Sequence, residues 1–415
     1  MNSEPVTPPQ SRLTGRLAGR RVVVAVTGGI AAYKSCYLVR ELISEGAEVQ
    51  VLMSNAATEF ITPLTFSTLS GRLVISEMFP ATPPIDPIHL TPSHWGDVFV
   101  VAPATADFLG KLAHGLADDV PSAAAMAFRG SILVAPAMNP NMWGSPAVQA
   151  NIDLLRSRGV EVIGPEFGEM GGVRESQGQG RMSEPVQVLD RIEELVSDRT
   201  RLAGKTVLVT SGPTRERLDP VRYLSNFSSG KMGDAIAREA HLRGAIVMLV
   251  RGKGATGTPP TGVELHEVES ASEMNDVVKL RFPDVDLLVM AAAVADWTPA
   301  KPSSTKLKKN AGGGLQIEWE QTDDILAWAG LTKTHQFVIG FALETNDHLA
   351  SGKQKLTTKN ADMIVLNDPT RPDSAFGGET IRLTLLSRNE DPMVLEVGTK
   401  RFAAGKILDA YMKLI

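Results

Sequence analysis

The stretch 222–231 combines two basic side chains, several hydroxyl groups and a glycine, all of which suit a phosphate or a carboxylate. An apolar, β-branched run at 206–210 precedes it, and apolar residues at helical spacing follow from 232 to 243. A strand would therefore deliver this loop to a helix N-terminus, where unpaired N–H groups and the helix dipole attract anions. A plain helix cap is the alternative. The candidate anion ligands are Arg222, Ser228, Ser229, Gly230 and Lys231.

A second candidate phosphate site follows the first apolar run of the chain. Residues 22–26 lead into a turn with two adjacent glycines, although the full Gly-x-Gly-x-x-Gly spacing of dinucleotide sites is missing. Ser54 follows the second strand pattern, and Thr105 follows the third. Because parallel strands end at the same sheet edge, we expect these loops to converge on a mononucleotide. The alternative is that the glycines serve only to pack a helix against a sheet.

Two polar side chains in the first half could act on a substrate. His89 is a candidate general base because histidine titrates near neutral pH, and a packed loop histidine is the alternative. Asn139 follows a strand pattern and could hold a substrate carboxylate, while Met142 and Trp143 exclude water. An Asx turn before Pro140 would explain the asparagine equally well.

Two series of strand patterns would position these loops. The first lies at 22–26, 49–53, 98–102, 132–135 and 160–163, and the second at 207–210, 246–250, 263–268, 287–291, 337–340 and 363–366. Helical patterns between them predict βαβ units, hence two doubly wound, Rossmann-like α/β domains with parallel sheets. We predict a disordered tail at 1–19, a first domain at 20–198 and a second at 202–415.

The composition excludes several classes of protein. A chain of 415 residues is too long for one ordinary core, in keeping with two domains. Its net charge of −5 comes without a basic cluster comparable to a nucleic-acid-binding arm, so nucleic acid and membrane surfaces are not expected partners. The single cysteine, Cys36, excludes an internal disulfide framework and fits a cytoplasmic location. No apolar run approaches a membrane span in length.

Four motifs of the first half occur together: Gly28 to Lys34, His89 with Trp95 to Asp97, Ala102 to Ala106, and Pro136 to Asn139. Together they resemble the flavin-containing cysteine decarboxylases, specifically the phosphopantothenoylcysteine decarboxylase domain. The resemblance implies a flavodoxin-like fold and FMN, which supplies the electron chemistry. It makes His89 the base and Asn139 the ligand of the departing carboxylate, with Met142 and Arg181 contacting substrate. The implied FMN contacts are Gly28, Gly29, Ile30, Ala31, Ser54, Ala104, Thr105 and Ala106.

One departure from that family concerns the substrate flap. The family's flap carries a cysteine proton donor before a Gly-x-Gly-Arg-Met ending. Here the ending is present at 178–182, whereas 167–182 contains no cysteine. Cys36 lies on a predicted helix, where packing is the commoner role of a free cysteine. Arg174, Ser176 or water could donate the proton in place of the missing flap cysteine. The alternative is that the first half has lost the decarboxylation chemistry.

The second half does not match the Walker phosphate motif, because Ser225 stands where glycine is needed and Met232 where a magnesium-binding hydroxyl is needed. Farther on, the strand pattern ending at 290–296 offers small residues and one carboxylate to a nucleotide. Lys306 begins a basic run. This run either supplies a mobile positive group to the nucleotide or is solvated surface without a role in binding. It lies in 301–314, which with 253–262 is expected to be a loop and, in one interpretation, a mobile lid.

Five motifs of the second half, at 219–231, 292–296, 306–309, 340–346 and 367–368, resemble bacterial phosphopantothenate–cysteine ligase. The resemblance implies that CTP activates the 4'-phosphopantothenate carboxylate as an acyl-cytidylate, which cysteine then captures. Asn226 would hold that intermediate, Arg222 would assist its formation or capture, and Lys306 would neutralise the triphosphate. The implied CTP contacts are Met290, Ala291, Ala292, Asp296, Asp323, Asp324, Ile325, Leu326, Phe341, Lys355 and Lys359.

The two resemblances together imply a bifunctional coenzyme A biosynthesis enzyme whose ligase half makes what its decarboxylase half consumes. Mg²⁺ is expected with CTP, although no carboxylate cluster identifies its ligands. The resemblance also implies a homo-oligomer, built as a dodecamer from decarboxylase trimers and ligase dimers. A two-domain NAD(P)-dependent oxidoreductase is the alternative enzyme, and a regulatory flavoprotein with a weakened decarboxylase half is the alternative without catalysis.

Overall fold

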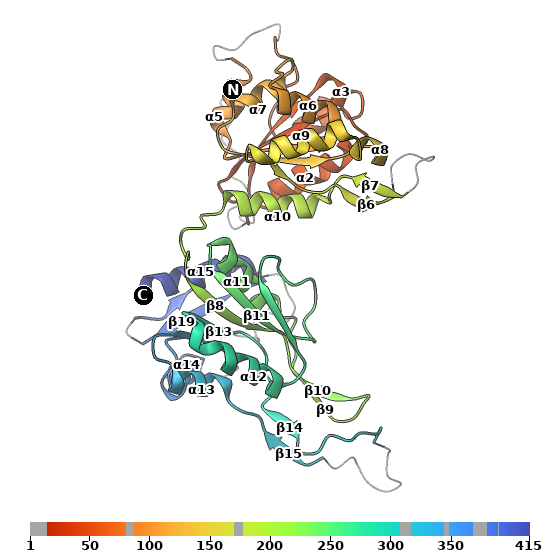
Figure 1. The fold of residues 1–415 in the computed structure, drawn as a ribbon. Coiled ribbons are helices and arrows are strands. Elements are labelled where there is room, and N and C mark those ends of the chain that lie inside the picture. Colours follow the sequence, from red (N-terminus) through yellow and green to blue (C-terminus); the bar gives the residue numbers. More distant parts are fainter. Residues whose placement is uncertain are drawn as a thin grey trace. The chain divides into compact units, whose positions relative to one another are not determined.

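The computed structural model describes residues 15–79, 87–169, 177–307, 317–343, 348–367, 380–388 and 390–415. The chain divides into two compact units, Met1–Ser197 and Asp198–Ile415 (Figure 1). Each unit is an α/β domain built on a mostly parallel sheet. The predicted fold class is therefore confirmed, and each of the eleven predicted strand patterns overlaps a strand.

The first unit contains a parallel sheet in the order β2-β1-β3-β4-β5. Its strands are β1 (Arg21–Val26), β2 (Glu48–Met53), β3 (Val98–Ala104), β4 (Ser131–Pro136) and β5 (Glu161–Val162). This is the flavodoxin-like strand order, in which the chain changes direction between β1 and β3. Because side chains alternate along a strand, Val22 and Val24 pack into one core cluster, and Val23 packs into the other.

Helices cover both faces of this sheet. Leu38 of α2 (Ala32–Ser44), Phe66 of α4 (Pro63–Ser70) and Leu189 of α10 (Pro185–Val196) pack on one face. Residues of α6 (Ala106–His114), α7 (Val120–Ala127) and α9 (Pro146–Ser157) pack on the other. Short elements complete the unit: α3 (Asn55–Thr58), α5 (Leu90–Trp95), α8 (Pro140–Trp143), and a hairpin of β6 (Glu166–Gly168) and β7 (Gly178–Arg181).

Residues 15–19 correct the predicted tail, because they pack against the first unit. Leu17 is fully buried, and its N–H donates to the Glu45 carbonyl at 2.9 Å. The Arg16 guanidinium bonds Asp190 at 2.7 Å and approaches Glu45 at 3.2 Å. The rest of the predicted tail, residues 1–14, lies outside the described residues. The sequence signal that we missed was the isolated apolar Leu17 beside a basic residue.

The second unit contains an eight-stranded sheet in the order β12-β11-β8-β13-β16-β17-β19-β20. Its parallel strands are β8 (Thr206–Ser211), β11 (Ile246–Gly252), β12 (Glu264–Val268), β13 (Leu287–Met290), β16 (Phe337–Leu343) and β17 (Met363–Asn367). The strand order reverses between β8 and β13, as in dinucleotide-binding folds. Two antiparallel strands that we did not predict, β19 (Leu383–Ser387) and β20 (Met393–Val394), extend the edge.

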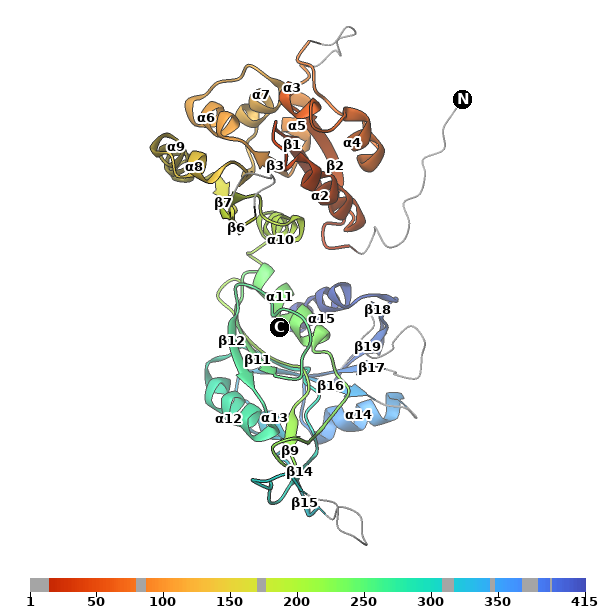
Figure 2. The same ribbon diagram turned by 90° about the vertical axis from the view of Figure 1, so that its right-hand side faces the viewer.

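In the second unit α11 (Lys231–Leu242) and α15 (Lys400–Leu414) cover one face of the sheet, where Val207 and Val209 pack. The helices α12 (Ala271–Arg281), α13 (Ile325–Thr332) and α14 (His348–Thr358) lie on the other (Figure 2). A 3-10 turn, η1 (Phe282–Asp284), follows α12. Three small ribbons pair β9 (Arg215–Arg217) with β10 (Tyr223–Ser225), β14 (Trp297–Pro299) with β15 (Trp319–Gln321), and β18 (Thr380–Ile381) with β21 (Gly398–Thr399).

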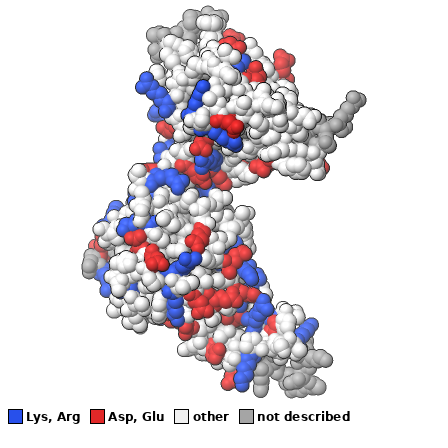
Figure 3. Space-filling model, in the orientation of Figure 1, with Lys and Arg blue, Asp and Glu red and all other residues white. Residues whose placement is uncertain are grey.

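The charge distribution on the surface and the length of the helices can be compared with the prediction that nucleic acid and membranes are not partners. On the face drawn in Figure 3, basic and acidic side chains are interspersed, and no continuous basic area is visible. Within the described parts of the chain, no helix combines the length and the apolar character that crossing a bilayer requires.

Candidate active sites

A cavity of about 930 Å³ lies at the carboxyl edge of the first sheet. The loops after β1, β2, β3 and β4 form its wall, so it occupies the point where the strand order reverses. Seven of the eight predicted cofactor contacts line it: Gly28, Gly29, Ile30, Ala31, Ser54, Thr105 and Ala106. The eighth, Ala104, is buried within β3 and is not a lining residue.

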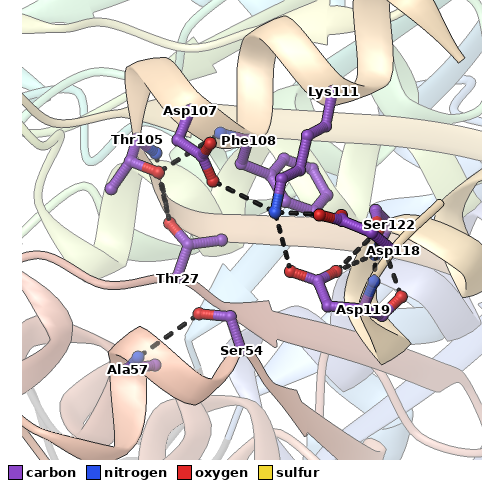
Figure 4. A network of polar contacts seen from close by, with 10 residues as sticks. All are labelled: Thr27, Ser54, Ala57, Thr105, Asp107, Phe108, Lys111, Asp118, Asp119 and Ser122. Atoms are coloured by element: carbon purple, nitrogen blue, oxygen red, sulfur yellow. Dashed lines mark hydrogen bonds and ion pairs between the residues drawn. The ribbon is translucent and has the colours of Figure 1, made fainter. Parts of the chain in front are cut away.

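Hydroxyl groups organise the loops around this cavity (Figure 4). The Thr27 hydroxyl donates to the Pro103 carbonyl at 2.6 Å and accepts the Thr105 N–H at 3.1 Å, which joins the loops after β1 and β3. Ser54 caps α3, and Thr105 caps α6. The first turn of α2 has no side-chain cap, so its N-terminus is open to an anion in the cavity.

The cavity also fits a phosphate because its turn leaves no room for a side chain at Gly28, whereas a Cβ at Gly29 would only be in ordinary contact with Thr105 at 3.6 Å. A Cβ added to Gly28 would lie 2.4 Å from the Ala56 Cβ. Backbone and ligand can therefore approach each other closely at this turn. The residues present fit a flavin mononucleotide.

We expect Gly28→Ala to weaken flavin binding by about 5–150-fold, because overpacking by one methyl group costs on the order of 1–3 kcal/mol. The alanine would push the turn away from α3 and displace the phosphate. Flavin retained per polypeptide, read from the absorbance of the purified protein, measures the effect. Gly110→Ala on α6 is the matched control, because its added Cβ would meet nothing closer than the Asn151 Nδ2 at 3.7 Å. Equal flavin content in both variants would contradict the prediction.

Lys111 forms an ionic cluster in the cavity wall that the sequence did not suggest (Figure 4). Its ammonium group lies 3.3 Å from Asp107, 3.0 Å from Asp118 and 3.4 Å from Asp119. Burial opposes the charged form, but these hydrogen bonds and charges outweigh it and raise the pKa of Lys111. The cluster ties α6 to the start of α7, where Asp119 also caps the helix by accepting the Ser122 N–H.

The predicted substrate contacts of the first unit also reach this cavity. Asn139, Met142 and Arg181 all line it. The Asn139 carboxamide oxygen accepts the Asn141 N–H at 2.8 Å, which is the Asx geometry that the sequence left open. Lys34, which we had not singled out, is buried in the same wall. Its ammonium group donates to the Met182 carbonyl at 2.8 Å and so attaches the end of the β6–β7 hairpin to α2.

His89, the predicted base, is not among the residues that line this cavity. It precedes α5, and its carbonyl accepts the Ser93 hydroxyl at 2.7 Å. Cys36 is half-buried on α2, and burial raises the pKa of its thiol. The two suggested proton donors of the flap, Arg174 and Ser176, lie outside the described residues.

In the second unit, Asp219 joins Arg222 to the segment that carries Lys306. The Asp219 carboxylate is fully buried and accepts Arg222 Nε at 3.0 Å and the Leu307 N–H at 3.1 Å. The Arg222 guanidinium also donates to the Leu307 carbonyl at 2.8 Å. The hydrogen bonds from Arg222 hold the pKa of Asp219 well below its usual range. Sequence reasoning assigned Asp219 no role, yet it positions two predicted catalytic segments.

The loops after β8 and β13 meet beside this network. The Asn226 carboxamide donates to the Val294 carbonyl at 3.0 Å, which places Asn226 against the turn after β13. Ala292 in that turn donates its N–H to the Thr210 hydroxyl at 3.2 Å. The predicted contacts Met290, Ala291 and Ala292 therefore lie where the strand order reverses, and Asp296 follows on the surface.

The structure separates Asp323 from Asp324. Asp324 caps α13 and forms an ion pair with Lys359. Burial opposes the charged form of Asp324. The hydrogen bonds from Lys359 and from the Ala327 N–H, together with the charge of Lys355, outweigh burial and lower the pKa of Asp324. Asp323 instead accepts Asn275 Nδ2 at 2.7 Å and Lys279 Nζ at 3.2 Å, so it contacts α12. Of the remaining predicted contacts, Leu326 packs on β16 beside Gly340, Ile325 is buried, and Phe341 is half-buried.

Two family models match the chain. The DNA/pantothenate metabolism flavoprotein C-terminal domain matches residues 202–414, and the model named Flavoprotein matches residues 10–197. The coenzyme A biosynthesis bifunctional protein CoaBC of Bacillus subtilis is 38% identical over 396 residues, which cover 94% of this chain and 96% of that protein. The chain belongs to this family of bifunctional coenzyme A biosynthesis proteins.

A second full-length relative and a solved domain structure are also similar to the chain. The family member from Vibrio parahaemolyticus is 39% identical over 403 residues, which cover 96% of this chain and 99% of its own. A crystal structure of the C-terminal domain of a family member is 38% identical, covers 52% of this chain and 97% of that one, and aligns with a TM-score of 0.45.

Membership of this family makes the chain a bifunctional enzyme, with a flavoprotein domain first and a ligase domain second. The predicted enzyme class and the two motif-based resemblances are confirmed. The two-domain NAD(P)-dependent oxidoreductase and the regulatory flavoprotein are not favoured.

Proposed function

We propose that the second unit joins 4'-phosphopantothenate to cysteine at the expense of CTP, and that the first unit uses FMN to decarboxylate the product to 4'-phosphopantetheine. The observation that carries the proposal is the Asp219 network, which aligns Arg222 with the segment of Lys306 at the nucleotide edge of the sheet. A guanidinium that is held in place, with a lysine on the segment bonded to it, suits an acyl-phosphate reaction, in which negative charge develops on transferred and leaving phosphates.

In the ligase half, the substrate carboxylate attacks the α-phosphorus of CTP, and pyrophosphate leaves. Lys306 and Arg222 offset the charge that develops on the phosphates, and Asn226 donates to the acyl-cytidylate. The cysteine amine then attacks the acyl carbon, and CMP leaves as the amide forms. The described residues contain no group of three His, Cys, Asp or Glu side chains that could hold a metal. We therefore propose that Mg²⁺ is bound mainly by the triphosphate, as Mg²⁺ sites with few protein ligands commonly are.

In the decarboxylase half, FMN would be held by the glycine turn after β1, by Ser54, and by the loop at Thr105. Bound FMN supplies the electron transfer that makes the cysteine carboxylate a leaving group. Asn139 orients that carboxylate, and Met142 and Arg181 complete the substrate wall. Arg174, Ser176 or water remains the proposed proton donor, in the absence of a flap cysteine.

We propose that the protein is a cytoplasmic homo-oligomer, a dodecamer in which first units associate as trimers and second units as dimers. The position of His89 supports the trimer. It precedes α5 and is not among the residues that line the cavity of its own copy, and a base supplied by a neighbouring copy would fit that position. Sedimentation of the full chain, with and without substrates, measures the assembly. A monomer that decarboxylates at full rate would contradict this part of the proposal.

The test is reconstitution of the purified full chain with 4'-phosphopantothenate, cysteine, CTP and Mg²⁺, followed by mass spectrometry. We expect the amide first and then the decarboxylated thiol, with one pyrophosphate per amide. Omission of CTP should stop both products, and supplied phosphopantothenoylcysteine should restore the second. Amide without carbon dioxide release would leave only the ligase half, and no product in the complete mixture would reject the proposal.

A further inference from the structure

The loop after β11, which the sequence suggested as a mobile lid, is attached to the anion-binding loop before α11. The Thr256 N–H donates to the Ser229 carbonyl at 3.0 Å, and the Thr256 hydroxyl contacts the same oxygen at 3.3 Å. The two loops are also in van der Waals contact. A Cβ added to Gly230 would lie 2.8 Å from the Ala255 Cβ. Gly230 adopts a φ of +77°, which is why the chain turns here and α11 begins.

A buried guanidinium holds this contact in place. Arg251, at the end of β11, is 5% exposed. Its Nε lies 3.3 Å and 3.2 Å from the two Asp234 oxygens, and its Nη2 donates to the Thr256 carbonyl at 3.0 Å and to the Gly257 carbonyl at 3.1 Å. One side chain therefore connects the first turn of α11 with the loop that packs on Gly230. Because its planar fork offers several donors in fixed directions, lysine cannot reproduce these contacts together.

The pair also changes the electrostatics of the helix start. Asp234 lies in the first turn of α11, where a carboxylate stabilises the helix but repels an incoming phosphate. Here the Asp234 carboxylate is turned inward: it accepts the Ser211 hydroxyl at 2.7 Å and pairs with Arg251 at 3.1 Å. The neighbouring charge of Arg251 compensates it. The helix start thus keeps its attraction for an anion although it carries an acidic residue.

We propose that Arg251 and Asp234 are positioning residues of the ligase site, which hold residues 228–230 in the conformation that receives a phosphate group of a phosphorylated substrate. The inference rests on the proposed ligase function. Neither residue is assigned a contact with substrate. They act through the Thr256–Ser229 hydrogen bond and through the packing of Ala255 on Gly230. A loop that is prearranged in its bound shape loses less entropy on binding.

The experiment compares Arg251→Met with wild type as full chains, with separate titrations of CTP, 4'-phosphopantothenate and cysteine. We expect kcat/KM to fall by about 10–100-fold for at least one phosphorylated substrate, since misplacement by about 1 Å costs on the order of 100-fold. The KM for cysteine and the decarboxylation of supplied phosphopantothenoylcysteine should stay at wild-type values. The affected titration shows whether the loop binds the nucleotide or the pantothenate phosphate.

The matched control is Arg243→Met at the other end of the same helix. Arg243 is equally buried, bonds Glu239 at 2.9 Å and Asp409 at 2.8 Å, and lies far along α11 from Gly230. We expect it to lower the melting temperature without changing KM. Equal losses of kcat/KM in both variants, or kcat/KM within twofold of wild type for both phosphorylated substrates in Arg251→Met, would overturn the proposal.

Two further variants keep the test informative if Arg251→Met does not fold. Arg251→Lys keeps the charge and loses the fork, and Asp234→Asn keeps the shape and loses the charge. Each should give an intermediate loss of kcat/KM for the same phosphorylated substrate, and wild-type values in both would reject the inference. Wild-type protein that makes no amide would instead reject the proposed function itself.

Discussion

Asn226→Ala is expected to slow amide formation by about 100–1,000-fold, because removing one fixed donor from a site of charge development costs that much. The carboxamide is already held in place, since it donates to the Val294 carbonyl at 3.0 Å in the turn after β13. Its removal leaves the cores of the unit untouched, so the variant should fold. Quenched-flow mass spectrometry of the ligase reaction measures the loss.

The first unit provides the reciprocal control. Asn139→Ala should abolish carbon dioxide release and leave amide formation intact, since Asn139 lines the cavity of the other unit. Asn226→Ala should do the reverse when phosphopantothenoylcysteine is supplied. Loss of both activities in either variant would mean that the substitution damages the fold or that the two reactions share a site.

Asp219→Asn should lower ligase kcat/KM by about 100-fold although the side chain keeps its shape. The Asp219 Oδ2 faces three donors, two from the Arg222 guanidinium and one from the Leu307 N–H, at 3.0, 2.5 and 3.1 Å. An amide group there would present its own N–H to these donors. Arg222 and the segment of Lys306 would then separate. Both KM for CTP and kcat should change, as expected when charged groups move away from the reacting phosphates.

The same residue predicts a dependence of stability on acid. Hydrogen bonds from Arg222 lower the pKa of Asp219 from its ordinary value of 3.8. A group whose pKa is lower in the folded state stabilises the fold above its unfolded pKa, and the contribution is lost as the pH falls through the folded pKa. Wild type should therefore lose stability below about pH 4 more steeply than Asp219→Asn, as thermal melts from pH 6 downward would measure.

Asp286→Asn is the control for both effects. Asp286 pairs with Lys205 at 2.9 Å and accepts the Thr206 N–H at 2.8 Å at the amino edge of the same sheet. Burial opposes its charge, but these bonds lower the pKa of Asp286 as well. It should reproduce the acid effect and keep ligase activity. If it loses as much activity as Asp219→Asn, the role of Asp219 is general stability.

The sheets and their ligand edges could be predicted because the information is local. Apolar β-branched runs such as 22–26 and 206–210 mark buried parallel strands, and the residues just after them must lie at one edge. This reasoning predicts that Gly28, Ser54 and Thr105 lie close together, and all three line the same cavity. The same reasoning did not predict β19 and β20. These strands pair antiparallel, so no crossover helix precedes them and the sequence shows no strand–helix–strand pattern there.

The side-chain networks could not be predicted because their members are far apart in the chain. Asp219 bonds Leu307 across 88 residues, and Arg251 bonds Asp234 across 17. Nothing in either local pattern indicates the partner. Asp323 and Asp324 show the opposite difficulty, because two residues that are adjacent in the sequence have different partners. Asp323 contacts Lys279 of α12, and Asp324 contacts Lys359.

The helix α15 has a consequence for synthesis of the protein on the ribosome. Ala404, Ile407 and Tyr411 are fully or almost fully buried, in the same core cluster as Val207 and Val209 of β8. The first unit has its own cores, built from residues 17–196. A nascent chain can therefore complete its flavin domain while translation continues, since domains fold as units from the N-terminus. Its ligase domain cannot close its core until residue 411 has emerged, so truncated products would bind flavin and make no amide.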